Sequence, residues 1–317
     1  MFKRSRIKVV STCLLVVMAS FLLAQTKVKR PSILGISHAA VYVHDLSRSR
    51  AFYEQYLSFN ESLALKRQDG TDRIALVKVN DEQSLELFAE DARDNVQLSH
   101  IAIYTDDAEH MRDYLLSRGI VVPDKVHKGQ AGNLFFTVKD PNGHLVEIVE
   151  YRPDGMTART RGQLMPADRV SRHLTHVGIL TGSVGPTLKF YRDILGFREF
   201  WHGSSVDDQQ HWISIRVPDG SDYIELMLYK DLPPAKERGL QNHLGLETDN
   251  LSKTIAELQS RMARYSYPYP IEVQIGKDRK RQASLWDPDG TRIEITESAT
   301  VEEQQVATRP AAGGEHH

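Results

Sequence analysis

Short stretches of alternating apolar and polar residues recur along the chain, and each is typical of a β-strand with one buried face. Ile36–Val43 alternates in this way, and Asp45 behind it is a suitable N-cap for a helix that would run to about Leu57. Further strand patterns follow at Arg73–Val79 and Ser84–Ala89. The order of strand, helix and further strands predicts a βαβββ unit.

A second unit of the same kind follows the first. Its opening strand is Ser99–Thr105, and its helix is expected over Ala108–Arg118 with Gly119 as the C-cap. Its last two strands flank the sequence Asp140-Pro141-Asn142-Gly143, and Asp287-Pro288-Asp289-Gly290 stands between two later apolar runs. Because Pro presets φ at the second turn position and Gly accepts a positive φ, D-P-x-G predicts a hairpin turn at both places.

The chain also repeats itself over a long distance. The segment ISHAAVYVHDLSRSRAFYEQYLSF from Ile36 is similar to LTHVGILTGSVGPTLKFYRDILGF from Leu174, and VKDPNGHLVEIVE is similar to LWDPDGTRIEITE. We therefore expect two similar domains at 33–152 and 173–298, joined by a Gly- and Pro-containing linker at 153–172. The tail at 299–317 is expected to be disordered. With two βαβββ units in each domain, the fold class is predicted to be α+β.

The N-terminal residues form a separate segment. Four basic residues precede the apolar run Val9–Leu23, which ends at Ala24-Gln25-Thr26, and this order predicts a secretory signal peptide over 1–24. At 15 residues the run is short for a membrane span, so we expect an exported protein, periplasmic or secreted, with no stable membrane insertion after cleavage. An uncleaved N-terminal membrane anchor is the alternative. Cys13 lies in this segment, so a cleaved chain would have no cysteine nucleophile, disulfide or cysteine-bound zinc.

The charge balance excludes one class of function. The 317 residues include 40 Lys and Arg and 42 Asp and Glu, which gives a formal net charge of −2. No basic stripe with interleaved aromatic residues is present, so we expect no nucleic-acid partner.

Two histidines and two glutamates fall on predicted strands in each half. The eight residues are His38, Glu86, His100 and Glu147 in the first half and His176, Glu225, His243 and Glu294 in the second. Their spacings are 48, 14 and 47 residues in the first half and 49, 18 and 51 in the second. Imidazole nitrogen and carboxylate oxygen are preferred ligands of divalent transition metals, so the pattern predicts a metal site in each half. The alternative is a duplicated scaffold that binds no metal, in which these polar residues persist without a function.

Strand alternation suggests that the two sites differ. In the second half, Glu225 shares a strand face with Tyr223 and Tyr229, and Gly178 and Gly245 accompany the histidines, which indicates a polar and roomy face. The corresponding face of the first half reads as tighter and more apolar. We therefore expect the second half to be the better site, with Tyr223 and Tyr229 as candidate pocket walls.

The D-P-x-G-x-x-x-E endings and the strand histidines resemble those of the vicinal oxygen chelate superfamily. This superfamily includes glyoxalase I, methylmalonyl-CoA epimerase, fosfomycin-resistance proteins and extradiol ring-cleavage dioxygenases. The resemblance covers about 33–298. It implies four βαβββ modules paired into two glyoxalase-like domains, each a curved mixed sheet around a metal cavity. The implied cofactor is a divalent ion, with Fe, Zn, Ni, Co and Mn all left open.

The resemblance implies three alternative functions for a small-molecule substrate. Our first expectation is a glyoxalase I-like lyase or isomerase for a substrate with adjacent oxygens, with Glu225 or Glu294 moving the proton. The second is an extradiol dioxygenase that holds Fe(II) through His176, His243 and Glu294. The dioxygenases also carry His and Tyr before the D-P turn, where this chain reads GKDRKRQASLW. The third is a non-catalytic exported binding protein of the bleomycin-resistance type. A homodimer is possible for all three.

Overall fold

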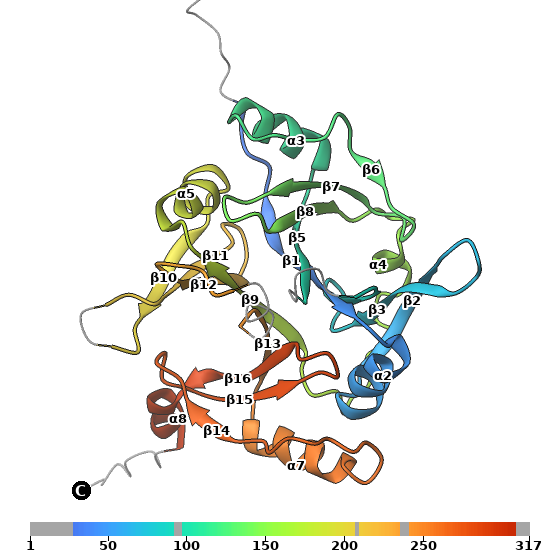
Figure 1. Ribbon diagram of the computed structural model, residues 1–317, viewed down its shortest axis with the longest axis vertical. Coiled ribbons are helices and arrows are strands. Elements are labelled where there is room, and N and C mark those ends of the chain that lie inside the picture. The colour runs from blue at the N-terminus through green and yellow to red at the C-terminus, as the bar shows by residue number, and fades with distance from the viewer. Residues whose placement is uncertain (1–27, 92–96, 207–208, 235–240, 309–317) are drawn as a thin grey trace, which may run out of the picture.

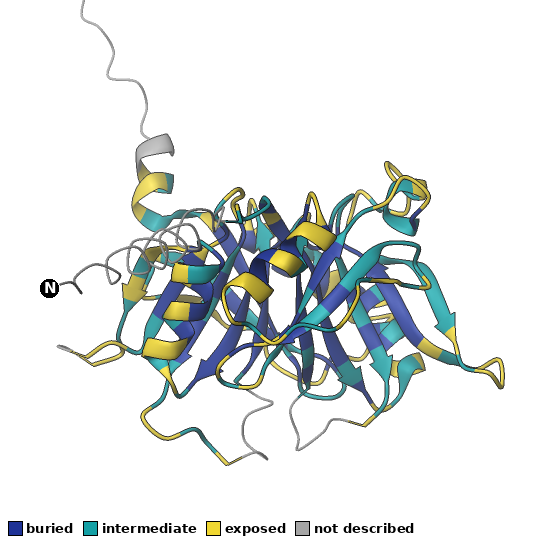
Figure 2. Ribbon diagram, turned by 90° about the horizontal axis from the view of Figure 1, so that it is seen from above, coloured by how far each residue is buried: buried dark blue, intermediate teal, exposed yellow. Residues whose placement is uncertain are grey.

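The computed structural model describes residues 28–91, 97–206, 209–234 and 241–308, and the expected signal peptide lies outside them. Two curved sheets of eight strands each fill the molecule, with the first half and the second half side by side (Figure 1). Buried strands run through the middle, whereas the outer helices carry many exposed residues (Figure 2). No helix in the described ranges is long and apolar enough to cross a membrane.

The first sheet is built from two βαβββ units that meet at its centre. Its strand order is β2-β3-β4-β1-β5-β8-β7-β6. β1 is parallel to β4 and antiparallel to β5, and β5 is parallel to β8. The strands are β1 (Ile33–Val43), β2 (Asn60–Lys66), β3 (Asp72–Lys78), β4 (Ser84–Ala89), β5 (Leu98–Thr105), β6 (His127–Lys128), β7 (Leu134–Lys139) and β8 (Leu145–Glu150).

The second sheet repeats the same topology. Its order is β10-β11-β12-β9-β13-β16-β15-β14, with the same parallel and antiparallel pairs at the centre. The strands are β9 (His173–Thr181), β10 (Arg198–Gly203), β11 (Trp212–Arg216), β12 (Tyr223–Leu228), β13 (His243–Thr248), β14 (Val273–Ile275), β15 (Lys280–Trp286) and β16 (Arg292–Thr300). The predicted fold class of four βαβββ modules in two curved mixed sheets is therefore confirmed.

The helices follow the first strand of each unit, except α4, which lies between the two halves, and α8, which follows the last strand. They are α2 (Leu46–Arg50), η1 (Ala51–Tyr56), α3 (Ala108–Ser117), α4 (Met156–Arg159), α5 (Val184–Leu188), η2 (Lys189–Ile194), α7 (Leu251–Arg261) and α8 (Val301–Thr308). The carboxylate of Asp45 accepts hydrogen bonds from the backbone N–H groups of Ser47 and Arg48, as expected of an N-cap. The sequence did not indicate that α2 and α5 each continue into a π-helical turn, η1 and η2.

The expected disorder of the tail is wrong for residues 299–308. β16 extends to Thr300, and α8 follows it directly. The Glu303 carboxylate accepts from the Thr300 N–H (2.7 Å), and the Thr300 hydroxyl accepts from the Glu303 N–H (3.3 Å). This reciprocal pair is a capping box, which stabilises the first turn of a helix. Residues 309–317 lie outside the described ranges.

The D-P-x-G turns do more than reverse the chain. The Tyr53 hydroxyl, on η1, donates to Asp287 Oδ2 of the second-half turn at 3.0 Å. In the pseudo-symmetric contact, the Tyr191 hydroxyl, on η2, donates to Asp140 Oδ2 of the first-half turn at 3.3 Å. Each turn is therefore tied to the helical segment of the other half, which fixes the two sheets relative to each other.

A buried carboxylate links the two sheets at their junction. Asp222 Oδ2 accepts from the Ile36 N–H (2.7 Å) and from Gln83 Nε2 (3.1 Å), both in the first half. Its other oxygen lies 2.6 Å from Nε2 of His173, in the second half. Gln83 also pairs with the backbone of Leu174, donating at 2.8 Å and accepting at 2.9 Å. This network holds β1 and β9 in one arrangement.

This network predicts a pH dependence of stability. The hydrogen bond to Asp222, with a smaller contribution from Glu247, raises the pKa of His173 to about 9. A raised pKa stabilises the folded protein fully below the pKa of an unfolded histidine, about 6.5, and this stabilisation is lost as pH rises through 9. We expect the free energy of unfolding to fall across this window. His173→Gln should flatten the slope in denaturant titrations with a chelator present, whereas the surface variant His110→Gln should keep it.

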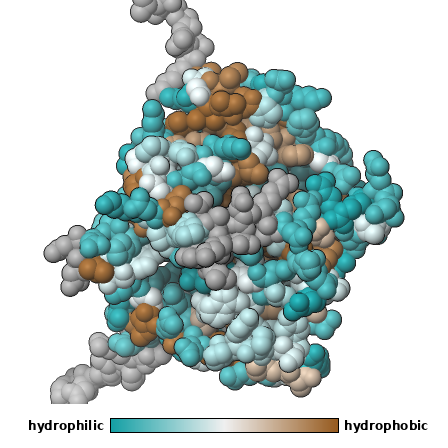
Figure 3. Space-filling model, viewed as in Figure 1, coloured by the Kyte–Doolittle hydropathy of each residue, from teal (hydrophilic) through white to brown (hydrophobic). Residues whose placement is uncertain are grey.

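The face of the molecule shown in Figure 3 is mostly hydrophilic, with a hydrophobic area at the end where α3 lies in Figure 1. Leu116 and Val121, at and beyond the end of α3, are among the exposed large hydrophobic residues. Apolar atoms contribute a large part of the surface of any folded protein, so this area by itself indicates no function.

Two candidate metal centres

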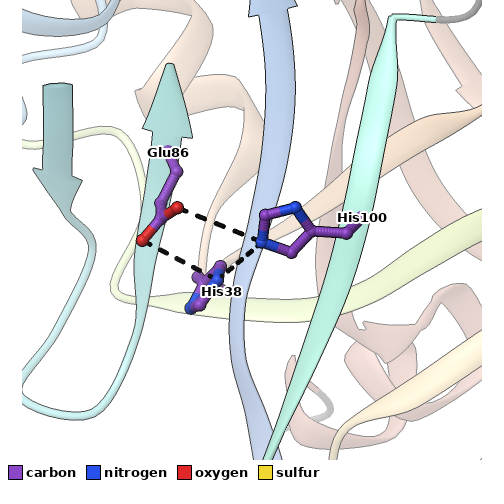
Figure 4. A group of neighbouring side chains, drawn as sticks. All are labelled: His38, Glu86 and His100. Atoms are coloured by element: carbon purple, nitrogen blue, oxygen red, sulfur yellow. Dashed lines mark hydrogen bonds and ion pairs between the residues drawn. The ribbon is translucent and has the colours of Figure 1, made fainter. Parts of the chain in front are cut away.

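The first group of donors comes from the four central strands of the first sheet. His38 on β1, Glu86 on β4 and His100 on β5 point toward one another (Figure 4). Nε2 of His38 lies 3.0 Å from Nε2 of His100 and 3.7 Å from Glu86 Oε1. Glu147 on β8 completes the group, with an oxygen 3.7 Å from His38 Nε2 and another 3.9 Å from His100 Nε2. Folding has thus brought all four residues together.

Neighbouring hydroxyl groups orient the two imidazoles. Ser37 Oγ lies 3.1 Å from Nδ1 of His38 and 2.8 Å from the Tyr151 hydroxyl. Ser99 Oγ lies 3.3 Å from Nδ1 of His100. When the Nδ1 atoms carry the hydrogen and donate it to these hydroxyls, the Nε2 atoms present their lone pairs to the common point. A partner on the far nitrogen is typical of histidines that ligate metals.

Burial sets the charge state of this group. It lowers the pKa of His38 to about 3 and that of His100 to about 4, so both imidazoles are neutral. Burial also raises the pKa of Glu86 and, further, that of Glu147, where the Glu86 charge adds to the effect. Two buried carboxylates in one group need a cation to compensate their charge. Neutral imidazoles beside carboxylates that lack a counter-charge are a donor set that fits a divalent metal.

A cavity of about 530 Å³ opens onto the first group, and all four donors line it. This volume falls in the range of small-molecule sites. Apolar residues form much of its wall, among them Leu65, Ile74, Leu76, Phe88 and Phe135. The linker contributes Met156 of α4, and the exposed His127 of β6 also lines the cavity.

The second group has the same origin in the second sheet. Donor atoms of His176 on β9, His243 on β13 and Glu294 on β16 lie within 4.8 Å of one another. His176 Nε2 is 3.7 Å from Glu294 Oε1, and Glu225 Oε2 on β12 is 3.3 Å from His243 Nε2. The structure therefore gathers all eight predicted donors into two groups of four. Their role as metal ligands stays a prediction.

The second group also fits a metal. Thr175 Oγ1 lies 3.0 Å from Nδ1 of His176, and the Gln241 carbonyl lies 3.3 Å from Nδ1 of His243. Nε2 of His243 is buried and makes no hydrogen bond within the described residues, as a nitrogen reserved for a metal would. Burial lowers the pKa of both histidines to about 3, and for His243 the Arg292 charge adds to it. Burial also raises the pKa of Glu225 and of Glu294.

Comparison with known proteins agrees with this geometry. The family model of the Glyoxalase/Bleomycin resistance protein/Dioxygenase superfamily matches residues 35–148 and again residues 173–295. The chain belongs to this superfamily. Metapyrocatechase 2 of Cupriavidus necator is 28% identical over 216 residues, which are 63% of this chain and 62% of that relative's length.

Solved structures share the fold at low sequence identity. An extradiol ring-cleaving dioxygenase from B. fuscum has a TM-score of 0.65 at 19% identity, covering 86% of this chain and 74% of its own. The Mn(II)-bound glyoxalase from Novosphingobium aromaticivorans has a TM-score of 0.63 at 16% identity, covering 84% and 83%. At these identities the likeness shows the fold alone.

These findings confirm three sequence-based predictions: the superfamily, the fold class and a divalent metal cofactor. The sequence did not reveal which residues shape a substrate cavity, and it gave no sign that Tyr151 and Ser37 support His38.

Proposed function

We propose that the protein is an extradiol-type dioxygenase, which uses Fe(II) and dioxygen to cleave the ring of a catechol. The observation that carries the proposal is the set of His38, His100 and Glu86 at the wall of the 530 Å³ cavity. Two histidines and one carboxylate that leave open positions are the donor set of non-haem Fe(II) oxygenases. The name of the relative metapyrocatechase 2 supports this reaction over the glyoxalase I-like lyase that the sequence first suggested.

Different residues of the cavity would bind the substrate and accept its proton. A bound Fe(II) ion supplies Lewis acidity and one-electron redox chemistry. The apolar side chains of Leu65, Ile74 and Phe135 exclude water and hold the ring. Glu147, whose two oxygens lie 3.7 Å from His38 Nε2 and 3.9 Å from His100 Nε2, would accept a hydroxyl proton from the substrate at a carboxylate oxygen.

The charges at the cavity favour a neutral catechol over one that carries a carboxylate. Arg73, Lys78 and Lys128 line the cavity, and each has an anionic partner, which is Glu90 at 3.4 Å for Arg73. Nζ of Lys78 donates to Asp81 Oδ1 at 2.8 Å, and Lys128 pairs with Asp154 at 2.5 Å. A substrate carboxylate would have to displace one of these partners, whereas an alkyl-substituted catechol would gain from the apolar wall.

Oxygen consumption tests the proposed reaction. We expect the Fe(II)-loaded protein to consume one dioxygen for each 4-methylcatechol that disappears, with slower turnover of 3,4-dihydroxybenzoate. Loading with Zn(II) should abolish the uptake, because zinc has no redox chemistry. Ligand-dependent stabilisation without a product would indicate a binding protein instead.

A glyoxalase-like reaction remains the second candidate, because all four donors of the first group lie within 4.0 Å of an imidazole nitrogen of the group. It predicts turnover without dioxygen and with Zn(II), Ni(II) or Co(II), which the same assay distinguishes. Export of the protein also stays a proposal. It rests on the basic residues that precede the apolar run Val9–Leu23, a segment outside the described residues.

A further inference from the structure

The two sheets have the same strand register, so each position in one half has a counterpart in the other. Ser84 pairs with His38 across β4 and β1, and Tyr223 pairs with His176 across β12 and β9. Tyr223 is therefore the counterpart of Ser84. The two positions differ by an aromatic ring directly beside a donor histidine.

The neighbouring strands extend this comparison. Lys78 pairs with Ser84, and Arg216 pairs with Tyr223. On the edge strands, one residue stands in a bulge in each half. This residue is Ser62, between Glu61 and Leu63, in the first half and Phe200, between Glu199 and Trp201, in the second. Arg216 and Phe200 are thus the counterparts of Lys78 and Ser62.

The three first-half residues all line the cavity, whereas their counterparts form a stack. The Tyr223 ring lies on the His176 ring, with centroids 4.6 Å apart and planes 17° apart. Phe200 packs edge-on against Tyr223 at 5.1 Å, and the Arg216 guanidinium lies 4.3 Å from the Phe200 centroid. Offset aromatic and cation–π contacts of this kind stabilise one another. The two rings thus stand at the positions where the first half has only the short side chains of Ser62 and Ser84.

The charges of the two groups differ at another matched pair. Leu145 pairs with His100 across β5 and β8, whereas Arg292 pairs with His243 across β13 and β16. Arg292 Nη2 lies 3.5 Å from Glu294 Oε2. The second group therefore contains its own counter-charge, and the first group does not have one at the matching position.

We infer that the two centres have different roles: the first half binds the substrate, and the second half is a centre closed to organic ligands by Phe200, Tyr223 and Arg216. The inference rests on the proposed function only for the choice of a catechol as the probe. One chain should therefore bind one catechol, at the first-half group.

Binding stoichiometry tests this division. The purified full-length chain is loaded with Zn(II) and titrated with 4-nitrocatechol without dioxygen, by calorimetry and by absorbance. We expect one equivalent for the wild type. Ser84→Tyr should weaken binding at least about tenfold, because the new ring would occupy the part of the cavity beside His38 that the probe needs. The double variant Phe200→Ser/Tyr223→Ser should open the second group and raise the stoichiometry to two.

Controls separate closure from damage to the fold. Ser260→Tyr, at an exposed position on α7, introduces the same side chain and should bind the probe as the wild type does. Zinc content and thermal stability of Ser84→Tyr should match this control. If Ser84→Tyr does not fold, the binding stoichiometry of Phe200→Ser/Tyr223→Ser still tests the inference.

Several results would overturn the inference. They are two equivalents for the wild type, no binding by the wild type, unweakened binding by folded Ser84→Tyr, or a single equivalent for the opening variant. A probe that binds in the expected pattern without any dioxygen uptake on Fe(II) loading would contradict the proposed reaction and leave the division of roles intact.

Discussion

Replacing His100 by alanine is expected to lower catechol-dependent dioxygen uptake by about 10³-fold or more, because loss of a donor removes several kcal/mol of metal-derived stabilisation. Replacing His243 by alanine should leave the uptake within about threefold of the wild type, because its group does not bind the substrate. The two residues occupy matched strands, and both are buried. Each substitution therefore controls for the structural cost of the other.

Initial rates with Fe(II)-loaded protein, together with metal content by elemental analysis, provide the measurement. Each variant should lose metal only from its own half. Far-UV circular dichroism and thermal unfolding check that both variants fold. If His243→Ala loses the activity and His100→Ala keeps it, the reaction takes place in the second half, as the sequence suggested, and the division of roles is wrong.

The elements and the donor groups could be predicted from sequence because both depend on local patterns. Alternating apolar residues identify strands, the D-P-x-G motif identifies hairpin turns, and the internal repeat shows that the histidines and glutamates recur in register. A repeated register implies a repeated place in the sheet, so each half had to collect its four donors. The paired modules then follow from the family resemblance.

The cavity could not be predicted in the same way, because it depends on which side chains fill a space. Gly178 and Gly245 suggested a roomy face in the second half. In the structure, a Cβ atom at Gly178 would fall inside the imidazole of His243, and one at Gly245 would fall inside that of His176. The donor histidines themselves occupy the space that the glycines leave. The prediction that the second half is the better site is untested, but its argument from small residues does not hold.

Contacts between the two halves also could not be predicted from the sequence. The pairing of Tyr53 with Asp287, and that of Gln83 with Asp222, join residues 234 and 139 positions apart. A turn aspartate and a strand-end glutamine are ordinary surface residues until the partner sheet covers them. Here both are buried, and each contact helps to hold the pseudo-symmetric sheets together.

The second large effect concerns the glycine beside a donor. Gly178→Ala is expected to push the His243 ring out of its place and to break the contact of Nδ1 with the Gln241 carbonyl. The first half has Ala40 at the matched position, and there the Nδ1 atom of the donor histidine, His100, lies 3.3 Å from Ser99 Oγ instead of a backbone carbonyl. The His100 side chain beside it is 10% exposed, whereas that of His243 is 0% exposed.

We expect Gly178→Ala to lower the free energy of unfolding by about 1–3 kcal/mol, the cost of an overfilled interior. It should also weaken zinc binding at the second group by at least about tenfold, the effect of misorienting a ligand. Zinc titration in a His100→Ala background isolates that group. Gly185→Ala is the matched control, because a Cβ atom on α5 meets open space. The control should keep or slightly raise the stability. If the two variants have equal stability and equal zinc affinity, Gly178 does not confine the His243 ring.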